Sequence, residues 1–490
     1  MSDHLNNHLY DVCIIGAGIT GLTLAYRLKK AGLQVAVLEK QPRAGGVIRT
    51  ETFDGFLFDQ GPNSTLTKTP QLETLIDEIG LRERVCFAND QASNRYILKH
   101  GRLCKLPMSP PAFLASNLLS WRGKLRIFAE PFIKPRREQT PESLADFVRR
   151  RLGQEALDYL VNPFIAGVYA GDPEKIDLQS ALPRLAELER KHGGLIRGAI
   201  AKKRQSKAKE LSTGPTGRLL SFDDGMHVLA DTLAQKLNDV LIVNAAVTAI
   251  RQAHENVEVS WQYAQGKTKK LAARKLVLAA PAKTSADLLE QLSPEIAEAL
   301  RKIIYAPVAV AFHGYQKAHI RNPLDGFGFL APEKENCKIL GAIWSSTIFP
   351  NRAPEGHAAL TTFVGGARQP ELAQKSENEL FEIIEAELGA HLGVEGAPAV
   401  RKMKLWPKAI PQYGLQHVAI LTQIEAFEKR HPGVRIAGNF RQGVSVGDCV
   451  DYAHALAQEI IEENHVRKPT QIHRFEDSQA RKTAAALAAQ

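Results

Sequence analysis

Gly16-Ala17-Gly18-Ile19-Thr20-Gly21 is the stretch that decides the fold, because it separates an apolar strand pattern from a helix pattern. Residues 10–15 are apolar and rich in β-branched side chains, which predicts a buried strand. Residues 19–30 have helical spacing of apolar side chains and end before Gly32, and residues 34–38 predict a second strand. Such a strand–helix–strand unit opens a parallel sheet covered by helices.

The three glycines of this run each have a physical role. Gly16 makes the tight turn, Gly18 lets a pyrophosphate approach the backbone, and Gly21 lets the helix pack closely on the strand. The diphosphate is then expected at the helix N-terminus. Glu39 ends the second strand 18 residues after Gly21, where its carboxylate accepts ribose hydroxyls and repels a 2′-phosphate. The sequence therefore predicts a dinucleotide site.

A second, relaxed match to the same pattern occurs at residues 326–331. No helix pattern follows it, so we do not expect it to bind a nucleotide. With one credible fingerprint, one dinucleotide is expected. Electrons then enter from a substrate rather than from a nicotinamide cofactor, and they leave to another acceptor.

Composition narrows the class of protein. The chain has 490 residues, of which 44% are hydrophobic and 24% charged, so it is neither disordered nor fibrous and has about three domains. No apolar run reaches the length of about 18 residues that a membrane-spanning helix needs. The five cysteines show no two-residue spacing, which favours free thiols in a reducing compartment and predicts neither a metal site nor a redox pair.

The net charge of +10 is concentrated in two segments. Residues 122–137 carry six Lys/Arg and one acid, and residues 191–218 carry eight Lys/Arg and one acid. Such local charge points to an anionic partner. Nucleic acid is disfavoured because no DNA- or RNA-binding motif accompanies the charge. Residues 201–217 are expected to form a surface loop, and residues 466–490 a poorly ordered tail.

A membrane surface is the favoured anionic partner. Apolar side chains recur at helical spacing in the first basic segment, at Leu118, Trp121, Leu125, Phe128 and Phe132. Basic side chains flank this stripe, at Arg122, Lys124, Arg126, Lys134, Arg136 and Arg137. An apolar stripe with a basic flank and an interfacial Trp is typical of a helix lying in the membrane plane. A helix packed on its own domain is the alternative.

Further stretches carry a resemblance to a known family. They are Arg43 to Gly46, Phe58 to Asn63, Asn94 to Ile97, Asn162 to Gly167, Gly171 to Pro173, Pro411 to Tyr413, Ala437 to Asn439 and Gly443 to Asp448. In this order, over about residues 9–465, the set resembles the flavin amine oxidase superfamily and, within it, the protoporphyrinogen oxidase family. Two departures stand out: Val47 replaces a common Arg, and Asp224 begins a stretch where Gly-Gly-Met is common.

The resemblance implies an α/β fold with additional helices. It has a discontinuous Rossmann-like FAD-binding domain (residues 1–68, 216–298 and 432–468) and a mixed-sheet substrate-binding domain (69–91 and 299–431). A helical membrane-binding domain (92–215) is inserted between their parts, and residues 469–490 form a tail. The implied attachment is peripheral, on the cytoplasmic inner face of the cell membrane.

The resemblance also implies site residues. FAD contacts are expected from Gly16, Ala17, Gly18, Ile19, Thr20, Gly21, Glu39, Lys40, Arg43, Gly45, Gly46, Val47, Gly61, Pro62, Asn63, Ser64, Val247, Trp406, Gly438, Val444, Ser445 and Val446. For the substrate, Arg95 is expected to bind a propionate, Gly167 to bring its backbone close to a pyrrole, and Leu330 and Trp344 to sandwich the macrocycle. No catalytic side chain is expected beyond the flavin, and His192, His313 and His417 are interpreted as surface or satisfied residues.

The implied activity is FAD-dependent oxidation of protoporphyrinogen IX to protoporphyrin IX in haem biosynthesis, by three successive hydride transfers to flavin. The alternatives are a coproporphyrinogen III oxidase, another flavin amine oxidase or desaturase, and a non-catalytic FAD-binding membrane protein. The electron acceptor, oxygen or quinone, stays open. Two further partners also stay open: a second copy of the chain, and a chelatase that receives the product.

Overall fold

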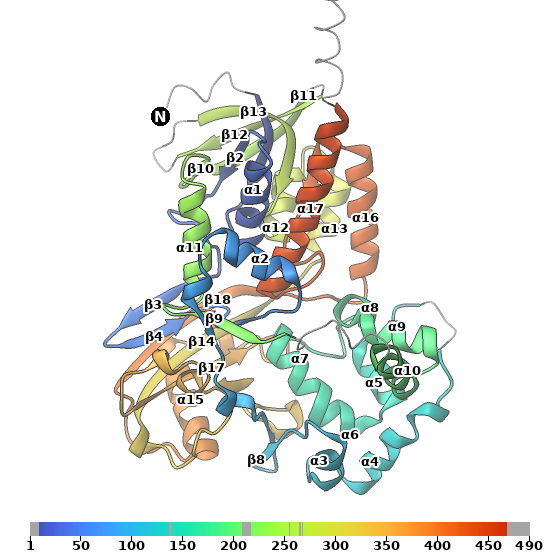
Figure 1. Cartoon of the computed structure of the whole chain (residues 1–490), viewed down its shortest axis with the longest axis vertical. Helices are drawn as coiled ribbons and strands as arrows, with labels where there is room; N and C mark the ends of the chain where they lie inside the picture. Colours follow the sequence, from blue (N-terminus) through green and yellow to red (C-terminus); the bar gives the residue numbers. More distant parts are fainter. Residues whose placement is uncertain are drawn as a thin grey trace, which may run out of the picture.

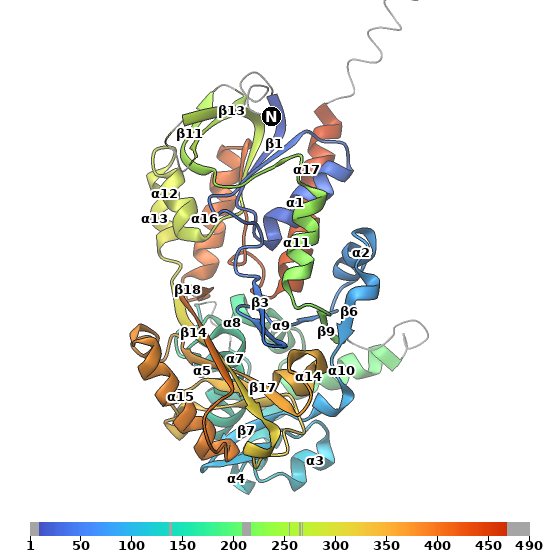
Figure 2. The same ribbon diagram turned by 90° about the vertical axis from the view of Figure 1, so that its left-hand side faces the viewer.

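The computed structural model describes residues 9–136, 140–207, 217–253, 255–263, 266 and 268–467. Figure 1 shows two halves, each built on a sheet, with a group of helices beside the lower sheet. The chain passes between the halves along the long strands β14 (Tyr305–Gln316) and β18 (Val400–Pro411). Both strands are edge-on in Figure 2, where they run down from the upper half into the lower sheet.

The upper sheet confirms the strand–helix–strand prediction. Its order is β10 (Leu241–Ile242), β2 (Val35–Leu38), β1 (Leu9–Ile15), β13 (Thr268–Leu278), β12 (Asn256–Gln262) and β11 (Ala246–Ala253), and β19 (Val434–Ile436) pairs with the end of β13. The strands β10, β2, β1, β13 and β19 are parallel, whereas β12 is antiparallel to β13 and β11 is antiparallel to β12. Helix α1 spans Ile19–Lys30, as the periodicity predicts.

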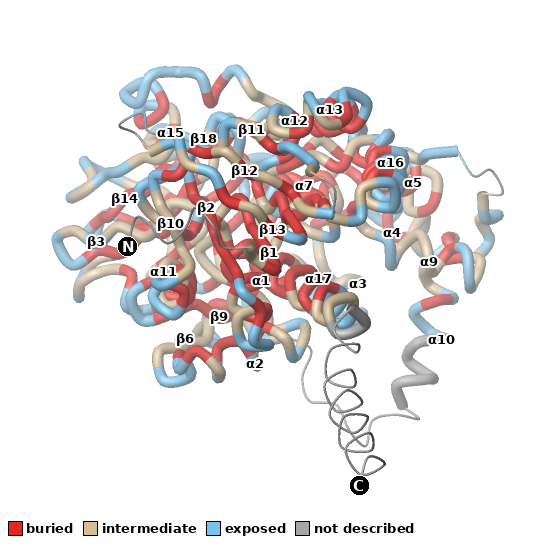
Figure 3. Tube along the Cα trace, turned by 90° about the horizontal axis from the view of Figure 1, so that it is seen from above, coloured by how far each residue is buried: buried red, intermediate tan, exposed pale blue. Residues whose placement is uncertain are grey.

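Alternation along the buried strands divides the upper core into two layers. Val12 and Ile14 point into one cluster, and Cys13 and Ile15 into the other. The first layer is covered by α1, α2 (Pro70–Glu78), α11 (His227–Lys236) and α17 (Val446–Arg467). The second is covered by α12 (Ala282–Leu289), α13 (Pro294–Arg301) and α16 (His417–Arg430). Figure 3 shows these central strands as the buried part of the trace.

Two helices depart from the expected domain boundaries. Residues 69–91 and 299–431 were assigned to the substrate-binding domain, yet α2 and α16 pack on the upper sheet. Their apolar faces explain this, because Leu72, Leu75 and Ile76 of α2, and Ile420, Ile424 and Phe427 of α16, are buried in its core.

The lower sheet is mixed and has seven strands. Its order is β18, β14, β17 (His357–Gly365), β16 (Gly341–Ile343), β15 (Gly328–Leu330), β7 (Tyr96–Lys99) and β8 (Arg102–Lys105). Helix α15 (Glu377–Leu392) covers one face. Residues 96–105 therefore belong to this sheet rather than to the helical domain predicted for residues 92–215. The second relaxed glycine match also lies here, in strand β15.

Smaller elements connect the halves. They are β3 (Thr50–Phe53) with β4 (Phe56–Asp59), the three strands β5 (Thr65–Leu66), β9 (Leu219–Phe222) and β6 (Val85–Phe87), and the short helix α14 (Ser345–Ile348).

The helical region consists of α3 (Pro110–Ala115), α4 (Trp121–Phe128), α5 (Leu144–Arg151), α6 (Gln154–Ala156), α7 (Asn162–Tyr169), α8 (Leu178–Ala181), α9 (Pro183–His192) and α10 (Leu195–Lys207). At its centre Arg151 and Glu130 form a fully buried ion pair, and Glu130 also accepts the N–H groups of Leu195 and Ile196. This carboxylate caps the start of α10. The helix continues to Lys207, so the predicted loop is wrong for residues 201–207. Residues 208–216 and 468–490 lie outside the described residues. Within the part of the chain described, no helix combines the length and apolarity needed to cross a bilayer.

Candidate active site

The glycine-rich turn has the geometry that a diphosphate site requires. Gly16 has φ +103°, and a Cβ there would lie 2.6 Å from the Ala279 carbonyl oxygen. A Cβ on Gly21 would lie 2.0 Å from the Gly16 carbonyl oxygen, so both positions exclude side chains. A Cβ on Gly18 would meet nothing within 4 Å. Gly18 is also the N-cap of α1 and provides no side-chain cap, which leaves the helix N-terminus available to an anion.

Glu39 stands beside this turn, as predicted. One carboxylate oxygen accepts the Ala17 N–H at 2.8 Å and the other accepts the Gln41 N–H at 2.8 Å. These bonds orient the carboxylate, and each oxygen retains a lone pair for a ribose hydroxyl. The backbone of Glu39 pairs with Ala245, which brings Val247 to the same end of the sheet.

Two further loops lie against the turn. The Gly45 N–H donates to the Ala17 carbonyl oxygen at 2.7 Å, and a Cβ on Gly46 would lie 3.3 Å from the Gly18 Cα. A Cβ on Gly61 would lie 2.1 Å from the Val47 carbonyl oxygen. The loops at residues 45–47 and 61–64 therefore extend one backbone-lined surface, which we call the glycine cradle together with residues 16–21.

Arg43 acts on the shape of the cradle. Its guanidinium donates to the carbonyl oxygens of Ala44 at 3.0 Å and Ile48 at 2.7 Å, so it holds the loop rather than pointing outward. Trp406 reaches the cradle from β18 and donates its indole N–H to the Gln60 carbonyl oxygen at 2.7 Å. Both residues therefore support the loops that carry the predicted flavin contacts, and Lys40 is exposed at the end of β2.

The loop before α17 carries the remaining predicted FAD contacts. Gly438 has φ +143°, and the Ser445 hydroxyl accepts the Asp448 N–H at 3.1 Å at the start of the helix. Tyr413 donates to the Asn439 carbonyl oxygen at 2.6 Å, and His417 Nε2 lies 2.9 Å from the Phe440 carbonyl oxygen. Burial lowers the pKa of His417 to about 4, so the neutral ring can donate to this carbonyl. His417 is thus satisfied only at Nε2, which supports the loop, whereas its buried Nδ1 has no hydrogen-bond partner among the described residues.

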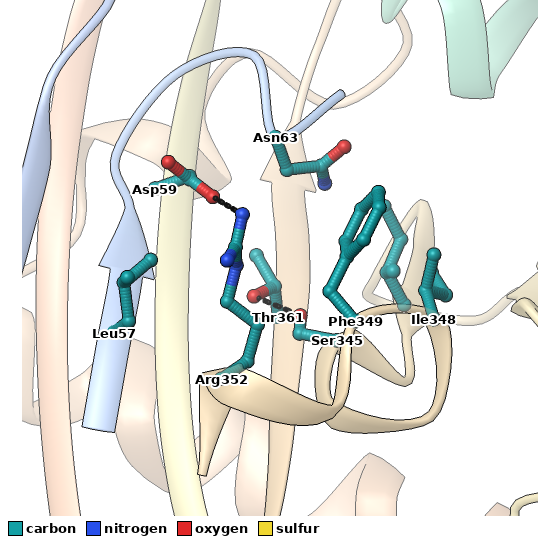
Figure 4. Close-up of a pocket in the computed structure, with 9 residues that line it drawn as sticks. Leu57, Asp59, Asn63, Ser345, Ile348, Phe349, Arg352 and Thr361 are labelled. Carbon is teal, nitrogen blue, oxygen red and sulfur yellow. Dashed lines mark hydrogen bonds and ion pairs between the residues drawn. The ribbon is translucent and has the colours of Figure 1, made fainter. Parts of the chain in front are cut away.

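An ion pair between Asp59, at the end of β4, and Arg352, just after α14, lies beneath Asn63 (Figure 4). Arg352 Nη2 lies 3.3 Å from the Asp59 carboxylate and donates to the Ser221 hydroxyl at 2.6 Å. Asp59 accepts the Met226 N–H at 2.9 Å. Burial raises the pKa of Asp59, and the neighbouring guanidinium opposes that rise. Sequence reasoning missed Arg352, because no local pattern connects it to a carboxylate so distant in the chain.

The predicted substrate residues Leu330, Gly167 and Arg95 share one side of the lower sheet. A Cβ on Gly167 would lie 2.8 Å from a Leu330 methyl, so α7 and β15 are in contact there. Leu330 pairs with Ile97 of β7. Arg95, two residues before Ile97, falls on the same side, is exposed, and places its guanidinium 5.5 Å from the Phe327 ring.

Trp344 does not lie on the same side of the lower sheet as Leu330 and Gly167. It is fully buried and packs against Tyr96, in the core that α15 covers. Leu330 pairs with Gly341, and Trp344 lies three residues further on, so strand alternation directs it to the opposite face. The predicted contact between Trp344 and a macrocycle is therefore wrong in this structure, because Trp344 packs under α15. Ile343, the residue before it, lines the pocket beside Asp59 and Arg352.

Comparison with known proteins assigns the chain to a family. The sequence pattern of flavin containing amine oxidoreductases matches residues 19–461. The chain belongs to this family. Its membership confirms FAD as the cofactor, and the open backbone at Gly18 with the orienting carboxylate of Glu39 fits a dinucleotide.

Within the family, the resemblance to the protoporphyrinogen oxidases is confirmed. The chain is 34% identical over 465 residues to the mitochondrial protoporphyrinogen oxidase of Nicotiana tabacum, covering 90% of this chain and 92% of the relative. It is 27% identical over 465 residues to the coproporphyrinogen III oxidase of Bacillus subtilis, covering 92% of this chain and 97% of the relative.

A solved structure confirms the fold. An Exiguobacterium protein provisionally assigned as a protoporphyrinogen oxidase superposes with a TM-score of 0.77 at 24% identity, over 92% of this chain and 98% of that chain. A reduced UDP-galactopyranose mutase superposes with a TM-score of 0.71 at 16% identity, over 93% of this chain and 94% of that chain. The flavin amine oxidase type of fold that the motifs implied is therefore present.

Proposed function

We propose that this chain uses FAD to oxidise protoporphyrinogen IX to protoporphyrin IX in haem biosynthesis. The observation that supports this most strongly is the 34% identity to a protoporphyrinogen oxidase over 90% of the chain. The glycine cradle and the apolar face at Leu330 and Gly167 supply the two surfaces that the reaction needs.

In this proposal FAD and the protein have different roles in the reaction. Bound FAD supplies the hydride acceptor for three successive two-electron oxidations of the macrocycle. The N–H groups at the start of α1 hold the diphosphate, and Glu39 binds the adenosine ribose. Arg95 pairs with a propionate and orients the ring against Leu330 and the Gly167 backbone. In this proposal the protein contributes position and exclusion of water, without a side-chain nucleophile or metal.

One assay tests the proposal. Purified chain is mixed with protoporphyrinogen IX and, separately, with coproporphyrinogen III, and the appearance of porphyrin fluorescence is followed in each. We expect the larger kcat/KM with protoporphyrinogen IX. Yellow protein that oxidises neither compound would overturn the enzymatic proposal and favour a non-catalytic FAD-binding protein.

A coproporphyrinogen III oxidase is the second candidate. The similarity to the Bacillus subtilis enzyme supports it, since 97% of that relative is covered. Its substrate carries four propionates rather than two, so it needs further cations near Arg95. A larger kcat/KM with coproporphyrinogen III in the same assay would select this candidate.

Peripheral membrane attachment is also part of the proposal. Large apolar side chains are exposed on and around α3 and α4, at the bottom of Figure 1: Met108 (69%), Leu114 (44%), Trp121 (67%), Leu125 (65%), Phe128 (51%) and Phe132 (84%). So many large exposed apolar side chains within residues 108–132 are unusual on a surface that meets only water. We call this set the apolar cluster and propose that it enters the headgroup layer of the inner face of the cell membrane, from the cytoplasm.

The structure corrects parts of the predicted stripe. Leu118 is buried, and so is Lys124, which donates to the carbonyl oxygens of Leu114 and Ser116. Arg126 donates to the carbonyl oxygens of residues 150 and 151. Arg122 and Lys134 remain exposed beside the apolar cluster. Arg137 lies outside the described residues.

Liposome sedimentation tests the attachment. We expect the chain to sediment with vesicles containing anionic lipid at low salt, and Phe132→Ser with Trp121→Ser to reduce the bound fraction severalfold. Ile304→Ser is the matched control, because Ile304 is also exposed (69%) but directly precedes β14, outside the apolar cluster. Equal binding by all variants would contradict this surface. A homodimer and transfer of product to a chelatase stay predictions.

A further inference from the structure

Three chemically different side chains converge behind the lower sheet. Cys337 lies in the loop between β15 and β16, whereas Glu387 and His391 lie four residues apart on α15. The Cys337 sulfur is 3.1 Å and His391 Nε2 is 3.0 Å from the same oxygen of Glu387. The sulfur and Nε2 are 3.9 Å apart. The three atoms therefore surround one point.

The helix that carries two of these groups is firmly placed. Ser376 and Glu379 form a capping box at its start, and Gly393 with φ +62° ends it. Leu388 and Leu392, the neighbours of Glu387 and His391, are buried in the sheet core. The side chains of His391 and Glu387 are only 13% and 16% exposed.

A catalytic triad does not account for the cluster. In such a triad the carboxylate binds the imidazole nitrogen remote from the thiol, whereas here Glu387 binds Nε2, the nitrogen nearest to Cys337. His391 Nδ1 is buried and has no hydrogen-bond partner among the described residues. Burial also raises the pKa of Cys337 to about 12, the opposite of an activated nucleophile.

A metal ion accounts for it better. Thiolate, imidazole and carboxylate are the donors that Zn²⁺ takes, and a tetrahedral ion with bonds of about 2.0–2.3 Å separates its donor atoms by roughly 3.3–3.6 Å. The observed separations of 3.0, 3.1 and 3.9 Å bracket that value. One thiolate and one carboxylate neutralise the charge of a divalent ion. The nearby Arg368 is held by Asn162 and by the Ala331 carbonyl oxygen.

We propose that Cys337, Glu387 and His391 form a binding site for one Zn²⁺ ion, with a fourth position open to water. The ion would fasten the loop at residues 331–340 to α15. The other side of that loop contacts α7, where Glu333 and Asn162 exchange two hydrogen bonds. The site therefore has a structural role, on the opposite side of the sheet from Leu330, and it goes beyond the proposed oxidase reaction. The cysteine spacing in the sequence had indicated no metal.

Cobalt substitution tests the site on the FAD-loaded, untagged full chain. After chelator treatment, we expect one Co²⁺ per chain, with d–d absorption at longer wavelength than the flavin bands and displacement by Zn²⁺. Cys337→Ser and His391→Gln should each weaken binding at least about tenfold. Cys86→Ser changes a half-buried cysteine on β6, in a different sheet, and should bind like the parent chain.

A second readout is thermal. Zn²⁺ should raise the Tm of the parent and of Cys86→Ser but not of Cys337→Ser, because a ligand stabilises only the state that binds it. Flavin absorption reports that each variant is folded, and Glu387→Gln replaces any variant that is not. The proposal is overturned if the parent binds no stoichiometric Co²⁺, or if the ligand variants bind it as tightly as the parent. Neither result depends on turnover of a porphyrinogen.

Discussion

The glycine cradle and the substrate side of the lower sheet are built differently. The cradle consists of backbone: its loops meet through N–H groups, carbonyl oxygens and the absence of side chains at Gly16, Gly21 and Gly61. The predicted substrate side instead combines the side chains of Arg95 and Leu330 with the backbone of Gly167, brought together from three distant segments. At Gly16, Gly21 and Gly61 the backbone leaves no room for a side chain, whereas a site made of side chains changes gradually with its residues.

The largest expected effect comes from the cradle. Gly21→Val should abolish folding and FAD binding, because a Cβ there would lie 2.0 Å from the Gly16 carbonyl oxygen. Gly18→Ala should fold with an unchanged Tm without FAD yet bind FAD at least about tenfold more weakly, since its space is open to the diphosphate. Flavin absorbance after gel filtration and thermal unfolding measure both. Equal FAD affinity of Gly18→Ala and the parent chain would contradict a diphosphate position next to Gly18.

The buried ion pair of Asp59 and Arg352 gives the next effect. Arg352→Leu leaves the Asp59 carboxylate buried without its cation, which should lower the free energy of unfolding by about 3–5 kcal/mol. Arg84→Ala, which removes the exposed pairs with Asp223 and Asp224, should cost less than about 1 kcal/mol. Urea unfolding of the FAD-loaded chains measures the difference. Similar losses in both variants would show that Arg352 does not act as a buried partner.

His417 gives a pH-dependent effect on the loop before α17. Burial lowers its folded pKa from 6.5 to about 4, and the charge of Arg441 adds to the shift. The neutral ring's contribution is therefore fully present above pH 6.5 and is lost as the pH falls toward 4, by up to about 3 kcal/mol. His417→Gln should have a flatter dependence of Tm on pH over this window. Parallel curves for variant and parent would contradict the shift.

The smallest expected effect is on the substrate side. Arg95→Ala should raise KM about tenfold, or ~1.4 kcal/mol, and lower kcat less, because it removes an anchor rather than a reacting group. Arg102→Ala, an exposed arginine on the neighbouring strand β8, is the control and should leave KM unchanged. Steady-state fluorescence kinetics measure both constants. A loss confined to kcat would place Arg95 outside substrate anchoring.

The sequence predicted the glycine cradle more completely than the substrate side of the lower sheet. The strands at residues 10–15 and 34–38, the helix at 19–30, and the placement of Glu39 beside the glycine turn are confirmed by the structure. The structure differs from the sequence prediction at Trp344, Lys124 and residues 201–207, because burial and capping depend on contacts that a local pattern does not show. The contacts of FAD and substrate with individual residues stay predictions.

By itself the sequence determined the dinucleotide turn and the family. Glycines that permit positive φ angles and the periodicity of apolar residues both follow from consecutive residues. Only the tertiary structure decided which faces those strands present and which distant groups meet. It directed Trp344 away from Leu330, paired Asp59 with Arg352, and gathered Cys337, Glu387 and His391. These contacts depend on how strands pair and how helices pack, and neither can be inferred from any single position in the sequence.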